Sequence, residues 1–245
     1  MKIEILKYPL IFKRPAGTSR GILKTKNTWF IKVFELDAPD DFGLGEINMF
    51  QGLSFDDNEG FYHQLEEIQE NPQFYIDNLH QELIDFPSIR FGLESALLDY
   101  SKSKNRILFP SKFTNGKAGI PINGLIWMGA KEEMKNQIKT KLEAGFSCLK
   151  LKIGAIDFLQ ELSILKSIRK EFKESDLELR VDANGAFSID DAIIKLDLLS
   201  KFHLHSIEQP IRQGQQEEMK ILCEKTPLAI ALDEELIGVN VPAQK

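Results

Sequence analysis

Cysteine, long apolar runs and excess positive charge are all scarce in this sequence of 245 residues. Its two cysteines, Cys148 and Cys223, are far apart and form no Cys-x-x-Cys pattern, which indicates free thiols in a reducing compartment. No run of about 18 apolar residues is present, so no segment is predicted to cross a membrane. The N-terminal apolar stretch is too short and too charged for a signal peptide. These absences predict a cytoplasmic protein.

The charge balance bears on possible partners. Acidic residues outnumber basic ones, 37 to 31, and the formal net charge is −6. A nucleic acid or an anionic membrane surface would favour a basic face, so neither is expected as a partner. Hydrophobic residues make up 42% of the chain and charged residues 28%, which is typical of a globular protein with a substantial core.

Two regions of the chain differ in the spacing pattern of their apolar residues. Residues 1–118 begin with alternating, turn-rich segments and continue with helical patterns at 61–83 and 88–100, which predicts a small α+β domain. Residues 119–245 alternate strand-like segments with helical segments of about 10 to 15 residues, which predicts parallel βαβ units. The units have similar lengths, which favours a barrel over an open sheet.

Ionisable residues recur near the carboxyl end of four consecutive predicted strands in the second region, the second to the fifth. Lys150 and Lys152 in "CLKLKIG" lie two apart and therefore share one face of a strand. A half-exposed strand with its lysines in water is one interpretation of that pattern alone. Asp182, Glu208 and Asp233 then follow at intervals of about one βα unit, on the same face. This repetition favours a shared site over a solvated surface.

The chemistry of such a site follows from its residue types. Ligands of parallel α/β folds bind at the carboxyl ends of the strands. Asp182, Glu208 and Asp233 would repel one another there unless a cation lay between them, and all-oxygen ligands favour Mg²⁺. Lys150 and Lys152 would lie near that cation and near each other, and both effects would lower the pKa of each lysine towards the range of a general base. One of the two lysines is thus predicted to transfer a proton, and the other to tune and position it.

The succession of KxK, "DAN", "EQP" and "DEE" on neighbouring strands closely resembles the enolase superfamily, in its muconate-cycloisomerase-like subgroup. The first region resembles the capping domain of that superfamily, including "GLGEINMFQGLSFD" as the loop after its strands. Within the subgroup, "RVDANGAF", "SIEQPI" and "IALDEEL" are most similar to o-succinylbenzoate synthases of menaquinone biosynthesis. The resemblance covers nearly the whole chain. It implies an α+β capping domain (1–118) followed by an α/β, TIM-type barrel domain (119–245).

The resemblance also implies a reaction. The expected enzyme is a magnesium-dependent lyase, with Mn²⁺ as a possible substitute, acting on a small-molecule carboxylate. It would dehydrate a succinyl-hydroxycyclohexadiene carboxylate to o-succinylbenzoate by syn loss of water through an enediolate. Lys152 would remove the α-proton and later protonate the departing hydroxyl. Lys150 would hold Lys152 in place and lower its pKa.

The family pattern assigns the metal to Asp182, Glu208 and Asp233. The adjacent Glu234 and Glu235 compete with Asp233 as ligands, but strand parity and the family pattern favour Asp233.

Three further residues are expected near the site. Asn184 lies on the same predicted strand face as Asp182 and is expected to contact the metal ligands without binding the metal itself. Thr18 and Arg20 belong to the loop "RPAGTSRG", whose counterpart in the superfamily covers the active site, so both are expected to contact substrate.

The family pattern also includes a lysine on a sixth strand, for which the chain offers no counterpart before its last residue, Lys245. We therefore expect a truncated chain with about five of the eight βα units of a barrel. An open sheet edge would favour self-association. Two alternatives stay open: an N-acylamino acid racemase or dipeptide epimerase on the same scaffold, and a catalytically inactive fragment.

Overall fold

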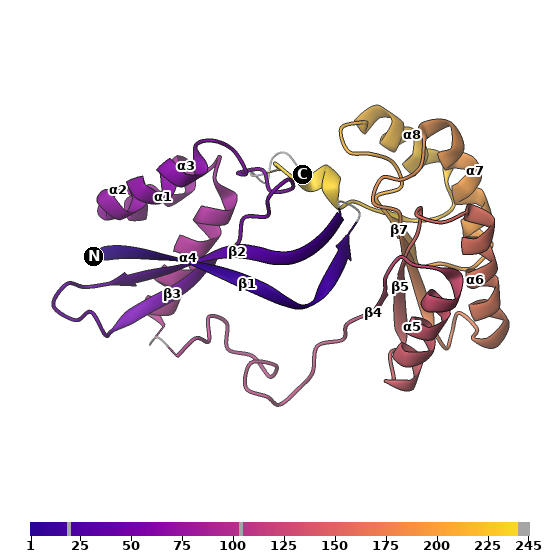
Figure 1. Cartoon of the computed structure of the whole chain (residues 1–245), viewed down its shortest axis with the longest axis horizontal. Helices are drawn as coiled ribbons and strands as arrows, with labels where there is room; N and C mark the ends of the chain where they lie inside the picture. The colour runs from indigo at the N-terminus through magenta and orange to yellow at the C-terminus, as the bar shows by residue number, and fades with distance from the viewer. Residues whose placement is uncertain (19–20, 103–104, 240–245) are drawn as a thin grey trace. The chain divides into compact units, whose positions relative to one another are not determined.

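The computed structural model describes residues 1–18, 21–102 and 105–239, and these form two compact units (Figure 1). The first unit comprises Met1–Ile120, to which Gly238 also belongs, and the second comprises Pro121–Ile237. Within the described ranges, no helix is long and apolar enough to cross a membrane.

The first unit is a three-stranded antiparallel sheet covered by helices. Its strands follow the order β1-β2-β3 and are β1 (Lys2–Thr18), β2 (Gly21–Phe34) and β3 (Phe42–Ile47). The helices are α1 (Phe61–Glu70), α2 (Pro72–Asp77), α3 (Leu79–Glu82) and α4 (Pro87–Ser101). Alternate residues of β2, namely Trp29, Ile31 and Val33, form the core together with the apolar faces of these helices.

The single helix expected over residues 61–83 is wrong, because three short helices occupy that range. The break after α1 lies at Asn71 and Pro72, and Pro72 begins α2. Proline has no N–H to continue a helix, and it disfavours a helical conformation at the residue before it. The second expected helix, over residues 88–100, is present as α4.

The second unit is a five-stranded parallel sheet in chain order, β4-β5-β6-β7-β8. The strands are β4 (Gly124–Ile126), β5 (Cys148–Lys152), β6 (Glu178–Asp182), β7 (Ser206–Glu208) and β8 (Ile230–Ala231). The helices are α5 (Lys131–Glu143), α6 (Phe158–Glu171), α7 (Ile189–Ser200), α8 (Gln216–Lys225) and the short 3₁₀ helix η1 (Glu234–Leu236). Figure 1 shows α5 to α8 on one face of the sheet. Strands in chain order with helices on one face form the wall of a (β/α) barrel, whereas a doubly wound sheet has helices on both faces.

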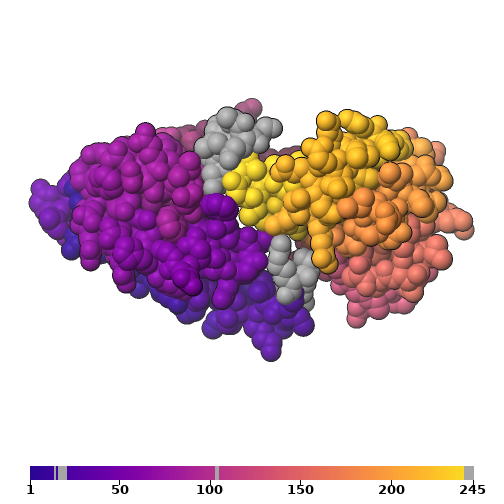
Figure 2. Space-filling model, turned by 90° about the horizontal axis from the view of Figure 1, so that it is seen from above, coloured from indigo at the N-terminus to yellow at the C-terminus, as the bar shows by residue number. Residues whose placement is uncertain are grey.

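Apolar residues on the helix side of each strand explain this arrangement. Leu149 and Leu151 of β5 and Leu179 and Val181 of β6 are buried against the helices, while Cys148, Lys150 and Lys152 face the other way. The helix boundaries follow local signals as well, since the Ser188 hydroxyl accepts a hydrogen bond from the backbone N–H of Asp191 at the start of α7. The side chains of α7 and α8 form a continuous outer surface (Figure 2). The opposite face of the sheet is therefore left for polar side chains.

Candidate active site

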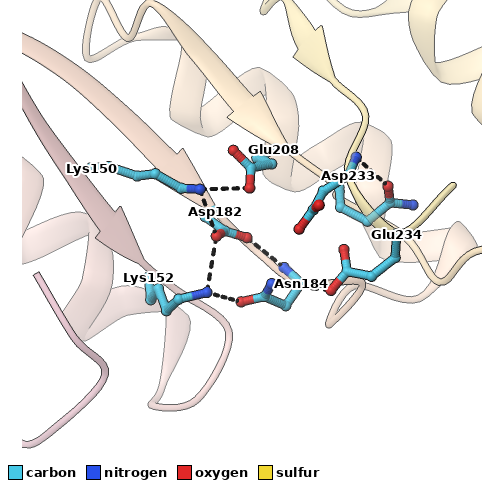
Figure 3. Close-up of polar contacts among 8 residues, drawn as sticks. Lys150, Lys152, Asp182, Asn184, Glu208, Asp233 and Glu234 are labelled. Carbon is cyan, nitrogen blue, oxygen red and sulfur yellow. Dashed lines mark hydrogen bonds and ion pairs between the residues drawn. The ribbon is translucent and has the colours of Figure 1, made fainter. Parts of the chain in front are cut away.

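Neighbouring strands of the second unit bring the predicted site residues to one height. Lys152 of β5 pairs with Asp182 of β6, and Asp182 pairs with Glu208 of β7. Glu208 pairs with Ala231, the last residue of β8. The parallel register therefore places these ionisable side chains at the carboxyl edge of the sheet, as their spacing in the sequence suggests. Figure 3 shows their side chains directed towards one another.

Both lysines contact the same carboxylate. The Nζ atoms of Lys150 and Lys152 each lie 3.0 Å from Oδ2 of Asp182, a side chain that is only 1% exposed. Lys150 Nζ also donates to Glu208 Oε1 at 2.5 Å. Lys152 Nζ donates to Asn184 Oδ1 at 2.6 Å. A buried carboxylate requires such partners, because an uncompensated charge is costly away from water.

The surroundings of Lys150 raise its pKa. Burial alone would lower it, but the hydrogen bonds from its ammonium to Glu208 and Asp182, and the negative charge of both carboxylates, outweigh burial. The sequence predicts a lowered pKa for both lysines, so for Lys150 the direction is the opposite of the expected one. The reason is that the Lys150 ammonium itself lies against both carboxylates. It neutralises them and is stabilised as a cation.

Asp233 lies beyond the end of β8, in the turn that leads into η1. The parity argument that placed it on a strand face is therefore wrong, because the strand ends at Ala231. Burial raises the pKa of Asp233, and the negative charges of Glu234 and Asp182 raise it further, although the two lysines act in the opposite direction. Asp233 thus lies within electrostatic range of Asp182 and of both lysines.

Asn184 connects the two sides of this group. Its backbone N–H donates to Asp182 Oδ1 at 3.0 Å, and its Nδ2 donates to Glu234 Oε1 at 3.2 Å. Because its Oδ1 accepts from Lys152, one side chain joins the strand-borne lysine to the turn after β8. The expected place of Asn184 on a strand face is wrong, because β6 ends at Asp182. Asn184 has a φ of 44°, a conformation in which asparagine is enriched among residues other than glycine.

Glu234 is a site residue whose contact the sequence did not predict. It is 8% exposed, and its Oε2 has no hydrogen-bond partner among the described residues. The acidic run "DEE" was a signal for it, but a run of three acids does not reveal which one turns towards Asn184.

The carboxylates fit a hard divalent cation by their chemistry, although they are not preassembled around one. No group of three or more histidine, cysteine, aspartate or glutamate side chains within the described ranges has the arrangement of a metal site. Here Lys150 provides the positive charge between Asp182 and Glu208. Burial, together with the negative charges of Glu234 and Asp182, raises the pKa of Asp233. Carboxylate oxygens of this type are the ligands of Mg²⁺.

Two expected substrate contacts cannot be placed. Arg20 and the side chain of Thr18 lie outside the residues that the structure describes.

Comparison with known proteins identifies several relatives. Residues 133–242 match the family described as Enolase C-terminal domain-like. The o-succinylbenzoate synthase of Desulfotalea psychrophila is 46% identical to this chain, and the alignment covers 98% of the chain and 73% of that protein. A hydrophobic dipeptide epimerase from a Flavobacteria bacterium is 24% identical, with 99% of the chain and 71% of that protein covered.

Solved structures agree in fold. The crystal structure of MenC from Desulfotalea psychrophila superposes with a TM-score of 0.82 at 40% identity, covering 100% of this chain and 73% of that one. The o-succinylbenzoate synthase of Thermosynechococcus elongatus, with Mg in its active site, gives a TM-score of 0.72 at 20% identity, covering 96% and 69%. The second similarity concerns the fold alone.

Proposed function

Because this chain belongs to the enolase superfamily, we propose that it dehydrates a succinyl-hydroxycyclohexadiene carboxylate to o-succinylbenzoate. The observation that carries the proposal is the position of Lys152, whose Nζ is held by Asp182 and Asn184 at the carboxyl edge of a barrel sheet. The 46% identity to an o-succinylbenzoate synthase supports this substrate class.

Lys152 is the proton-transfer group in this proposal. It removes the proton α to the substrate carboxylate and later donates that proton to the departing hydroxyl on the same face. The electron pair of the broken C–H bond forms the new ring double bond, the C–O bond breaks, and the hydroxyl leaves as water. Lys152 gains one proton in the first transfer and loses it in the second, so no further acid or base is needed. Asn184 and Asp182 fix the direction of its Nζ during both transfers.

Lys150 has a different role, because its Nζ contacts both Glu208 and Asp182. Its ammonium holds Asp182 and Glu208 and so fixes the carboxylate that also contacts Lys152. Lys150 and Lys152 thus meet at one oxygen of Asp182, and Lys150 positions Lys152 through that shared carboxylate.

Mg²⁺, or Mn²⁺ in its place, would be held by Asp182, Glu208 and Asp233. When bound, the ion supplies positive charge that stabilises the negative charge developing on the substrate carboxylate.

A dipeptide epimerase is the second candidate, favoured by the epimerase that aligns with 99% of this chain. Both reactions begin with removal of a proton α to a carbonyl group, so Lys152 would serve either one. Incubation of the purified protein with the cyclohexadiene substrate and, separately, with hydrophobic dipeptides distinguishes them. We expect o-succinylbenzoate from the first and no change in the second. Epimerised dipeptide with no dehydration would contradict the proposal.

A further inference from the structure

Gln209, the residue after Glu208, is a buried amide whose hydrogen-bonding groups are all used. It is 0% exposed, and its Oε1 accepts from the backbone N–H groups of Asp233 at 3.1 Å and Glu235 at 3.2 Å. Its Nε2 donates to Ile211 O at 3.0 Å and lies 3.4 Å from Glu235 Oε2. An amide has two donor hydrogens and two acceptor lone pairs, so each has a partner.

The hydrogen bonds of the Gln209 side chain hold a segment that the sheet ladder does not reach. β8 ends at Ala231, so the ladder between β7 and β8 does not extend to Asp233. The Asp233 N–H bonds to the Gln209 side chain instead. The Gln209 backbone N–H in turn donates to Ala231 O at 2.9 Å. Gln209 therefore forms hydrogen bonds both to the end of β8 and to the turn that follows.

Glu235 fastens the same turn at a second point. Its Oε1 accepts from the backbone N–H of Gly214 at 3.2 Å, in the loop after β7, and its Oε2 faces Gln209. Gln209 has a φ of 40°, which a residue with a long side chain rarely adopts unless its surroundings fix it. The turn after β8 is therefore clamped to the loop after β7.

We propose that Gln209 is a positioning residue that sets the place of Asp233 relative to Glu208. Glu208 is on the strand and is fixed by the ladder, whereas Asp233 depends on the amide of the adjacent residue. Gln209 thereby links the positions of two of the three carboxylates assigned to the metal: Glu208 is its neighbour in the chain, and Asp233 is bound to its side-chain amide. This inference rests on the proposed function, because the relative position of the two carboxylates matters only if they share an ion.

The substitution Gln209→Met tests this coupling. Methionine has nearly the same length but cannot accept from the Asp233 and Glu235 N–H groups. Gln213→Met is the matched control, because Gln213 is exposed in the same loop and takes the same change. Titration with Mn²⁺, followed by the electron paramagnetic resonance signal of the free ion, measures affinity without any turnover. We expect Gln209→Met to weaken Mn²⁺ binding about 10- to 100-fold, and Gln213→Met to bind like the wild type.

Two results would overturn the inference: Mn²⁺ affinity of folded Gln209→Met within about threefold of wild type, or an equal loss in Gln213→Met. If the wild type binds no Mn²⁺, the metal site of the proposed function is wrong and the inference falls with it.

Hydrogen exchange of the wild type decides the matter if Gln209→Met fails to fold. The Asp233 and Glu235 amide hydrogens should exchange at least about 100-fold more slowly than in an unstructured peptide, because a buried acceptor holds both. Unprotected exchange at these two amides would overturn the clamp itself, whatever the protein does with metal.

Discussion

The carboxyl edge of the sheet in the second unit has two regions that are held in place differently. On β5, β6 and β7, Lys152, Asp182 and Glu208 are fixed by the regular strand ladder. After β8, Asp233 is placed by a side-chain amide and lies in a turn. A ladder repeats one regular backbone pattern along several strands, whereas the turn depends on a few individual side-chain hydrogen bonds. The strand-borne region should therefore tolerate changes in the surrounding loops better than the turn-borne region.

Replacement of Lys152 should have the largest effect, because it removes the proton-transfer group from the strand-borne region. Lys152→Ala should lower the dehydration rate by about 10²- to 10⁴-fold. Lys152→Arg should fail nearly as badly, since a guanidinium keeps its proton at any usable pH. Lys139→Ala, at an exposed lysine of α5, is the control. Steady-state rates of the three variants provide the measurement, and a Lys152→Ala rate within about tenfold of wild type would require a different base.

Asn184 joins the two regions, so its replacement should have the second-largest effect on the rate. Asn184→Ala removes the acceptor that holds Lys152 Nζ and the donor to Glu234. We expect the turnover number to fall about 10- to 100-fold, the range seen when supporting partners of a metal site are removed. Asn136→Ala on α5 is a matched control. Measurement of both turnover numbers under saturating substrate tests the bridge, and an unchanged value for Asn184→Ala would show that the regions act independently.

The next effect concerns stability: loss of Lys150 should lower the free energy of unfolding of the metal-free protein. Lys150→Ala leaves Asp182 and Glu208 without the ammonium between them, and the repulsion should lower the free energy of unfolding by about 1–3 kcal/mol, a value reduced for the partial exposure of Lys150 and Glu208. Saturating Mg²⁺ should recover most of that loss, because the ion replaces the missing charge. Urea unfolding with and without Mg²⁺ gives both numbers. Equal losses in the two conditions would contradict this role of Lys150.

The smallest effect is expected at Glu161, which fastens the loop after β5. Glu161 Oε1 accepts from the backbone N–H of Gly154 at 2.6 Å, and its Oε2 has no hydrogen-bond partner among the described residues. The nearby backbone N–H groups of Ala155 and Ile156 also favour the charged carboxylate. Burial raises the pKa of Glu161 in spite of these N–H groups. Glu161→Ala should lower the free energy of unfolding by about 1–2 kcal/mol, because the Gly154 N–H loses its acceptor but the cost of burying a charge disappears.

Thermal unfolding of Glu161→Ala beside Glu143→Ala, an exposed glutamate on α5, measures this difference. A stable Glu161→Ala variant would show that the ladder alone fixes the end of β5.

The same division explains which features could be predicted from the sequence. The period of two places Lys150 and Lys152 on one face, and the even βα spacing gives the heights of Asp182 and Glu208, because both depend on local geometry. The barrel-type fold follows from the same alternation of strands and helices.

Other features depend on contacts that no local pattern reveals. The place of Asp233 requires the Gln209 amide, which lies on another βα unit. The raised pKa of Lys150 requires knowledge of which carboxylates its ammonium contacts. The break of the helix at residue 71 is different, since Pro72 was a visible signal in the sequence.

The central claim is that the strand-borne and turn-borne carboxylates act as one metal site. The most direct test is the rate of o-succinylbenzoate formation by the wild type after dialysis against excess chelator, and again after addition of Mg²⁺. We predict that activity is lost without the ion and restored by it. Full activity in excess chelator would contradict the claim.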